Sequence, residues 1–168
     1  MLINPNLTEK SEFNRNSIVN YKNTLDIDFL DDNTIKIKKK EKADLGLIYI
    51  DLFNQIEKGS KIAFTGELEL ISGPNVKLVF NGFDADSRNI TRKGKNSIEA
   101  IGGKNSAVNQ VQVRLYHNEE VIFKFVKMKL EEGDKATPYI PHKDLIDPSK
   151  QAIYLAGGVF QEVYPVEA

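Results

Sequence analysis

The feature that most constrains this chain is the alternation of apolar and polar residues in short runs through its middle. Leu25, Ile27 and Phe29, for example, alternate with Asp26 and Asp28. The same period of two recurs in four further runs, at 34–38, 60–71, 76–80 and 111–115. Because successive side chains of a β-strand point to opposite faces, each run predicts a strand with one buried face.

Residues that favour turns separate these runs. They include Asp31-Asp32-Asn33, Gly59, Ser72-Gly73-Pro74, Gly82 and Gly102-Gly103. The segment 45–52 is apolar on both faces, which predicts a strand that is covered on both sides. Roughly seven to nine short strands at intervals of about ten residues indicate an all-β sandwich or barrel.

The alternation slips by one residue within 121–130. Val121, Phe123 and Phe125 set one phase, and Met128 and Leu130 set the other. A β-bulge inserts one extra residue into a strand and therefore shifts the phase of the alternation. We predict a bulge near Phe125.

Length, charge and cysteine content narrow the range of functions. The 168 residues, 40% of them apolar, suffice for one buried domain with an appendage. A net charge of −1 argues against a nucleic-acid or acidic-membrane partner. The absence of Cys excludes disulfides and thiolate sites. We expect neither a signal peptide nor a membrane span, because no apolar run is long enough.

The segment 126–141 predicts the end of a domain. Gly133 permits a sharp turn, and Pro138 and Pro141 remove backbone donors, so strand pairing cannot continue through them. We therefore expect a sandwich domain over 1–141 and a C-terminal extension over 142–168. Gly157-Gly158 lies between two apolar runs and predicts a β-hairpin in the extension. An isolated hairpin is marginal in water, so its apolar residues are candidates for an interface. These residues are Tyr154, Leu155, Val159, Phe160 and Tyr164.

Three segments carry a resemblance to a known group of proteins. The segment 126–141, with its Gly turn and Thr-Pro-Tyr-Ile-Pro ending, resembles the closing strand of carbohydrate-binding-module-like jelly-roll domains. Lys58–Gly66 is similar to one of their strands, and Asn6-Leu7 with Phe13-Asn14 is similar to their opening. Such domains occur in tail and other structural proteins of phages that infect Gram-positive bacteria. The chain departs from their pattern in lacking Trp, and Tyr139 stands where the closing Trp would be.

The resemblance implies a jelly-roll β-sandwich and a non-enzymatic virion structural role in a phage tail, baseplate or head fibre. The protein would be made in the cytoplasm of the bacterial host and would assemble with other virion proteins. It would form a homo-oligomer, with a trimer as one form, and would attach to cell-wall polysaccharide of the host. Two alternatives stay open. One is a stand-alone carbohydrate-binding module, and the other is a ligand-free decoration protein that oligomerises through its C-terminal hairpin.

The strand over 109–116 offers the best candidate ligand surface. If its Val and Leu side chains enter the core, a row of amide, guanidinium and phenol groups lines the opposite face. Such groups suit a saccharide, because they hydrogen-bond to hydroxyls and stack on C–H groups. Two residues of 45–52 would join the row if that strand is a neighbour. The candidate ligand-binding residues are Gln110, Gln112, Arg114, Tyr116, Tyr49 and Asp51. A second candidate is the polar loop 83–95, which includes Asn89.

The sequence carries no enzyme signature. Two His without Cys do not give a zinc spacing, and the glycine-rich segments do not match a P-loop. The acid pairs Asp26/Asp28 and Glu67/Glu69 are typical of any exposed strand. The resemblance also implies that a structural Ca²⁺ could lie near the start and the closing strand, although no ligands can be assigned. Oxygen donors there are Asn4, Asn6, Glu12, Asn14, Glu131, Glu132 and Asp134.

Overall fold

The structure, a computed structural model, describes residues 12–51, 57–106 and 110–139. In these ranges it contains ten strands and one short 3-10 turn. The elements are β1 (Val19–Asn20), η1 (Tyr21–Asn23), β2 (Leu25–Phe29), β3 (Thr34–Lys39), β4 (Gly46–Asp51), β5 (Lys61–Ser72), β6 (Val76–Asn81), β7 (Arg88–Ile90), β8 (Gly94–Gly103), β9 (Gln110–Leu115) and β10 (Val121–Glu132). None of the helical segments in the described ranges is long and apolar enough to cross a bilayer.

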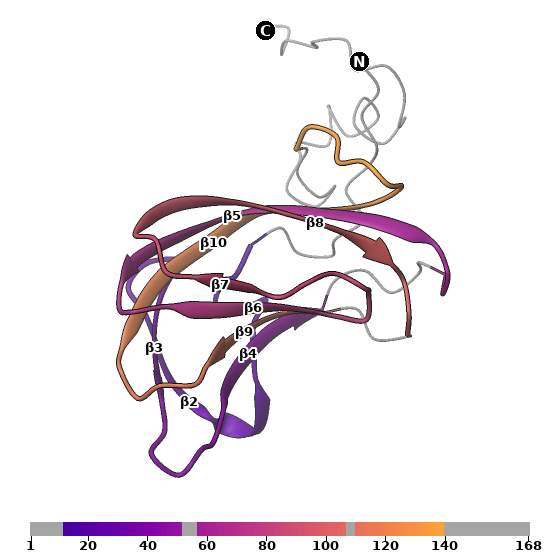
Figure 1. Cartoon of the computed structure of the whole chain (residues 1–168). Helices are drawn as coiled ribbons and strands as arrows, with labels where there is room; N and C mark the ends of the chain where they lie inside the picture. The colour runs from indigo at the N-terminus through magenta and orange to yellow at the C-terminus, as the bar shows by residue number, and fades with distance from the viewer. Residues whose placement is uncertain (1–11, 52–56, 107–109, 140–168) are drawn as a thin grey trace, which may run out of the picture.

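The strands form two five-stranded antiparallel sheets that face each other (Figure 1). One sheet has the order β1-β4-β9-β6-β7, and we call it the β9 sheet. The other has the order β2-β3-β10-β5-β8, and we call it the β10 sheet. The middle strand of each sheet pairs with strands that are distant in sequence, as in a jelly roll. The predicted all-β, jelly-roll sandwich is confirmed.

The core lies between the sheets and follows the predicted alternation. Most residues of the predicted inner phases are at most 4% exposed: Leu25, Ile35, Ile37, Ile62, Phe64, Leu68, Leu70, Val76, Leu78, Phe80, Val111, Val113 and Leu115. Ile27 and Phe29 of the first predicted run are only half-buried, because β2 is an edge strand, and they pack against the core from its side. Aromatic rings link the layers, with Phe64 of β5 and Phe80 of β6 at 5.3 Å between centroids. Phe13 is fully buried, its ring is 5.2 Å from that of Phe125, and its amide donates to the Phe125 carbonyl.

The predicted bulge near Phe125 is present in β10. The pairing of β10 with β5 shifts register between Val126 and Lys129. Lys127 lies inside this interval with φ of 55°, a left-handed conformation that is uncommon for a residue other than glycine. The bulge explains how Phe125 and Met128 both enter the core, although three positions separate them.

The segment that follows β10, where the sequence predicts the end of a domain, is bonded to the sandwich. Gly133 has φ of 130°, and its amide donates to the Lys61 carbonyl on β5. Thr137 is held by side chains of β10. The boundary at 141, the hairpin and the candidate interface residues lie outside the described residues, so they stay predictions. The last group comprises Tyr154, Leu155, Val159, Phe160 and Tyr164.

Candidate binding face and pocket

The strand β9 lies in the middle of its sheet, which places its outer side chains among those of two neighbours. Gln112 has Tyr49 of β4 as its Cα partner on one side and Val79 of β6 on the other. Val113 and Leu115 are fully buried in the core. The alternate residues of β9 therefore line the outer face, as the sequence predicts.

A line of hydrogen bonds runs along this face. Asp51 Oδ1 accepts from Gln110 Nε2 at 3.2 Å, and Gln110 Oε1 accepts from Gln112 Nε2 at 3.1 Å. Gln112 Oε1 accepts from Arg114 Nε at 2.9 Å and from Nη2 at 2.6 Å. The line ends with a long contact of 3.5 Å from Arg114 Nη1 to the Tyr116 hydroxyl. We call these five residues the polar ladder.

The six predicted ligand-binding residues thus gather on one face, but they differ in access to solvent. Gln112 is only 4% exposed, so its main effect is to fix the direction of Arg114. Tyr49 is half-buried and Asp51 is exposed. Tyr116 is 55% exposed, and it is the large ring that an approaching ligand meets first. Their role in binding stays a prediction.

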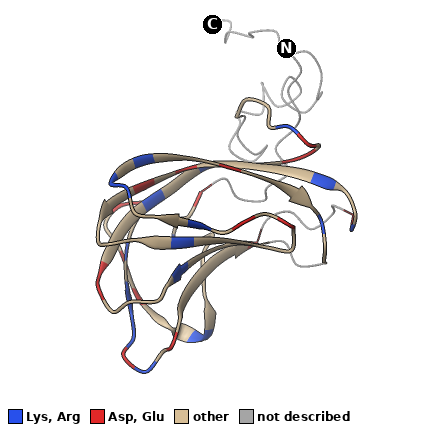
Figure 2. Ribbon diagram, viewed as in Figure 1, with Lys and Arg blue, Asp and Glu red and all other residues tan. Residues whose placement is uncertain are grey.

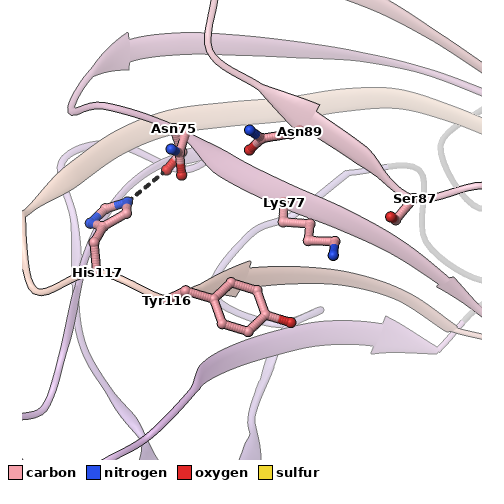
Figure 3. A pocket seen from close by; sticks show the side chains of 6 residues that line it. All are labelled: Asn75, Lys77, Ser87, Asn89, Tyr116 and His117. Atoms are coloured by element: carbon pink, nitrogen blue, oxygen red, sulfur yellow. Dashed lines mark hydrogen bonds between the residues drawn. The ribbon is translucent and has the colours of Figure 1, made fainter.

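An open pocket of about 620 Å³ adjoins the Tyr116 end of the ladder (Figure 3). Residues at the ends of three strands line it: Asn75, Lys77, Ser87, Asn89, Tyr116 and His117. The Lys77 ammonium lies 5.6 Å from the centre of the Tyr116 ring, within reach of a cation–π interaction. His117 Nε2 lies 3.0 Å from the Asn75 carbonyl oxygen, which ties the turn after β9 to the start of β6.

Sequence reasoning found only part of this pocket. Tyr116 was in the predicted row and Asn89 in the predicted loop, but Lys77, Asn75 and His117 were missed. The alternation Val76-Lys77-Leu78 already places Lys77 on the outer face of its strand. The missing information was that β6 is the neighbour of β9, which local alternation does not reveal.

Most of the predicted polar loop 83–95 forms strands or makes hydrogen bonds within the sandwich. Its middle forms β7 and its end starts β8. Arg88 donates to the carbonyls of Asp86 at 2.7 Å and Glu99 at 3.1 Å, which joins the loop to β8. The Asp84 carboxylate accepts from the Asn105 amide at 2.7 Å. Within this loop, Asn89 and Ser87 are the residues that line the pocket.

The structure describes five of the oxygen donors considered for Ca²⁺: Glu12, Asn14, Glu131, Glu132 and Asp134. No group of three or more His, Asp or Glu side chains in the described ranges could hold a metal ion. Glu131 accepts a hydrogen bond from Thr137 and forms an ion pair with Lys129, so its carboxylate holds the segment after β10 in place. Glu12 accepts from Asn14. Asn4 and Asn6 lie outside the described residues.

Comparisons with known proteins identify the fold. No protein-family model and no curated protein matches the sequence. The fold is similar to the structure of the Clostridium thermocellum N-terminal endo-1,4-beta-D-xylanase 10B, CBM22-1 and GH10 modules, complexed with xylohexaose. That match has a TM-score of 0.53 and 9% identity, and it covers 84% of this chain but only 31% of the xylanase chain.

Two family 29 carbohydrate-binding modules also match the fold. One, from Piromyces equi, has a TM-score of 0.41 and 12% identity over 74% of this chain and 87% of its own. The other, a CBM29-2 variant, has a TM-score of 0.47 and 11% identity over 88% and 96% of the two chains. The match to the xylanase structure, at 9% identity, shows a shared fold alone, and the function has to be argued from the site.

Proposed function

We propose that this protein is a non-catalytic carbohydrate-binding module whose ligand lies on the outer face of the β9 sheet. The observation that carries the proposal is the polar ladder, which ends at the exposed ring of Tyr116 beside an open pocket. Amide and guanidinium groups hydrogen-bond to sugar hydroxyls, and a phenol ring packs against the C–H face of a sugar.

The internal hydrogen bonds of the ladder support a binding role. Gln112 holds the guanidinium of Arg114 through two bonds, so this side chain has one preferred direction before a ligand arrives. A pre-organised side chain loses less conformational freedom when it binds. The fold supports the proposal as well, because it is shared with a structure that contains a carbohydrate-binding module and xylohexaose.

The carboxylates considered for hydrolysis favour a non-catalytic protein. Asp28 pairs with Lys36 at 3.1 Å, Asp26 with Lys40 at 3.8 Å, and Glu67 with Lys95 at 3.9 Å. The Asp28 and Asp26 side chains are 68% and 70% exposed. Ion pairs of this kind are typical of any solvated strand face, whereas hydrolysis needs an acid and a base that converge on one substrate bond.

The virion setting inferred from the sequence resemblance stays a prediction. In that setting the module would sit in a phage tail, baseplate or head fibre and bring the particle to cell-wall polysaccharide. The homo-oligomer and the contacts with other virion proteins would then involve the C-terminal extension, which lies outside the described residues.

The direct test is binding of the purified chain to Gram-positive cell walls and to a panel of soluble polysaccharides. Tyr116→Ala should weaken binding at least about fivefold, since a stacked ring contributes on the order of 1 kcal/mol. Tyr21→Ala is the matched control, because Tyr21 is 43% exposed and lies in η1, away from the pocket. Equal weakening by both variants would refute the assignment to the Tyr116 end of this face. Failure of the intact chain to bind any saccharide would refute the function.

A further inference from the structure

Two cationic side chains lie directly opposite each other on the proposed binding face. Lys77 of β6 and Arg114 of β9 are Cα partners, and both belong to the outward-facing phases of their strands. Figure 2 shows the blue segments of β6 and β9 next to each other at this place. Like charges that face each other across a strand pair destabilise a sheet. The pair of cations therefore destabilises the folded sheet unless neighbouring groups stabilise the two charges.

Among the described residues, only neutral groups contact these two cations. Arg114 donates to the Gln112 amide oxygen and contacts the Tyr116 hydroxyl. The Lys77 ammonium lies over the Tyr116 ring. Within the described residues, neither cation takes part in an ion pair, whereas Lys36 on the opposite sheet reaches a carboxylate at 3.1 Å.

No acidic side chain among the described residues lines the pocket beside these cations. Asn75, Ser87 and Asn89 add neutral hydrogen-bonding groups, and His117 adds an imidazole. The carboxylate of the ladder, Asp51, lies at the opposite end, where it is the Cα partner of Gln110. The outer face of the β9 sheet is therefore polarised. The carboxylate of Asp51 lies at one end, whereas at the other end Lys77 lines the pocket and Arg114 lies next to it, in contact with the Tyr116 hydroxyl.

We infer that the pocket binds the anionic group, a carboxylate or a phosphate, of an acidic saccharide. Lys77 would supply a mobile ammonium, and Arg114, positioned by Gln112, would supply a planar pair of donors. The Tyr116 ring would pack against the sugar that carries the anion. This inference rests on the proposed function and deepens it, because it names the class of saccharide that the same face recognises.

The test compares an acidic polysaccharide with its neutral counterpart of the same backbone and adds a polymer that carries phosphate. Polygalacturonate and its fully methyl-esterified form differ in the carboxylate, and glycerol-phosphate teichoic acid supplies phosphate instead. The chain should bind one acidic polymer at least about tenfold more tightly than the neutral form, as charge-assisted hydrogen bonds imply. Lys77→Gln should remove most of that difference. The acidic polymer that binds more tightly shows whether the pocket prefers a carboxylate or a phosphate.

The matched control is Lys61→Gln, which removes one positive charge from an exposed strand position on the opposite sheet. It should leave the preference for the acidic polymer intact. Equal loss in both lysine variants would mean that only the overall charge matters, and it would overturn the pocket assignment. Lys77→Gln should also raise the thermal stability of the protein or leave it unchanged, because it relieves the repulsion with Arg114.

The outcomes separate this inference from the proposed function. Equal binding of acidic and neutral polymers, lost in Tyr116→Ala, would overturn the preference for an anion and leave the saccharide-binding function in place. No binding to any polymer would overturn both. Stronger binding of an acidic polymer that is lost in Lys77→Gln and kept in Lys61→Gln would support both.

Discussion

The Lys129 ammonium and the Glu131 carboxylate lie 3.2 Å apart in the interior, with their side chains 0% and 1% exposed. Lys129 Nζ also donates to the Thr137 hydroxyl at 2.6 Å and to the Pro138 carbonyl at 2.8 Å. Glu131 in turn accepts from the amide and the hydroxyl of Thr137. This buried ion pair attaches the closing segment to β10. Burial lowers the pKa of Lys129, and the charge of Glu131 opposes that shift.

Replacement of Glu131 by Gln should lower the free energy of unfolding by about 3–5 kcal/mol, because it leaves the ammonium of Lys129 buried without a counter-charge. Urea denaturation at neutral pH measures the loss. The double variant Glu131→Gln/Lys129→Met should recover part of it, since it removes the buried ammonium together with its counter-charge. A double variant as unstable as the single one would show that the charge pairing is unimportant here.

Gly102→Ala should destabilise the protein by about 1–3 kcal/mol, as expected when a group is forced into filled space. A Cβ at this position would lie 1.8 Å from the Asp84 carbonyl oxygen, so the backbone of one of the two segments would have to move. Gly103→Ala is the control, because its Cβ would come no closer than 3.9 Å to the Asp84 carboxylate. Thermal denaturation should separate the two variants, and similar losses would contradict the close approach at Asp84.

Asp31 gives the stability of the β2–β3 turn a predictable pH dependence. Its carboxylate accepts from the Thr34 hydroxyl at 2.8 Å and from the amides of Asn33 and Thr34, and these bonds lower its pKa. A carboxyl with a depressed pKa stabilises the folded state above its unfolded pKa of about 3.9. This stabilisation is lost as the pH falls through the lower, folded pKa.

Asp31→Ala should therefore be less stable than the unaltered protein near pH 6, and the difference should shrink as the pH falls below about 4. Urea denaturation across this range provides the measurement. Asp32→Ala is a suitable control, because the neighbouring Asp32 is also exposed and makes none of these hydrogen bonds. A constant difference between Asp31→Ala and the unaltered protein at all pH values would contradict the prediction.

Gln112→Met should weaken saccharide binding about tenfold while it changes the stability by less than about 1.5 kcal/mol. The Met side chain has a similar shape, but it lacks the oxygen that accepts from Arg114 Nε and Nη2. Hydrogen exchange at Arg114 Nε, followed by NMR, should become faster because the guanidinium loses this acceptor. Faster exchange with unchanged affinity would mean that the direction of Arg114 is irrelevant to binding.

Much of the fold and part of the site could be predicted from the sequence, because alternation is a local property. The period of two assigned Val113 and Leu115 to the core, and it assigned Gln112 and Arg114 to the opposite face. The slip in phase near Phe125 likewise located the bulge, because an inserted residue changes the local pattern. For the same reason the candidate residues of β9 lie on one face, as the alternation predicts, and their role in binding stays a prediction.

The solvent exposure of each candidate residue of β9 could not be predicted from the sequence. Gln112 is 4% exposed although it lies on the outer face, because Tyr49, Val79 and Arg114 surround it from three sides. The sequence also indicated the loop 83–95 as a second candidate ligand site. In the structure, Arg88 and Asp84 of this loop make hydrogen bonds within the sandwich instead. A charged side chain in a loop bonds to whatever the tertiary structure brings near it, and no local pattern records that.

The sequence by itself determined which side chains of each strand face inward, because the two faces of a strand alternate along the chain. Only the tertiary structure decided which strands are neighbours. It placed β6 beside β9, and thereby Lys77 opposite Arg114 and beside Tyr116. Pairing between distant strands depends on how the whole core packs. The pocket, with Lys77 in its lining and Arg114 beside it, could therefore be recognised only in the folded sandwich.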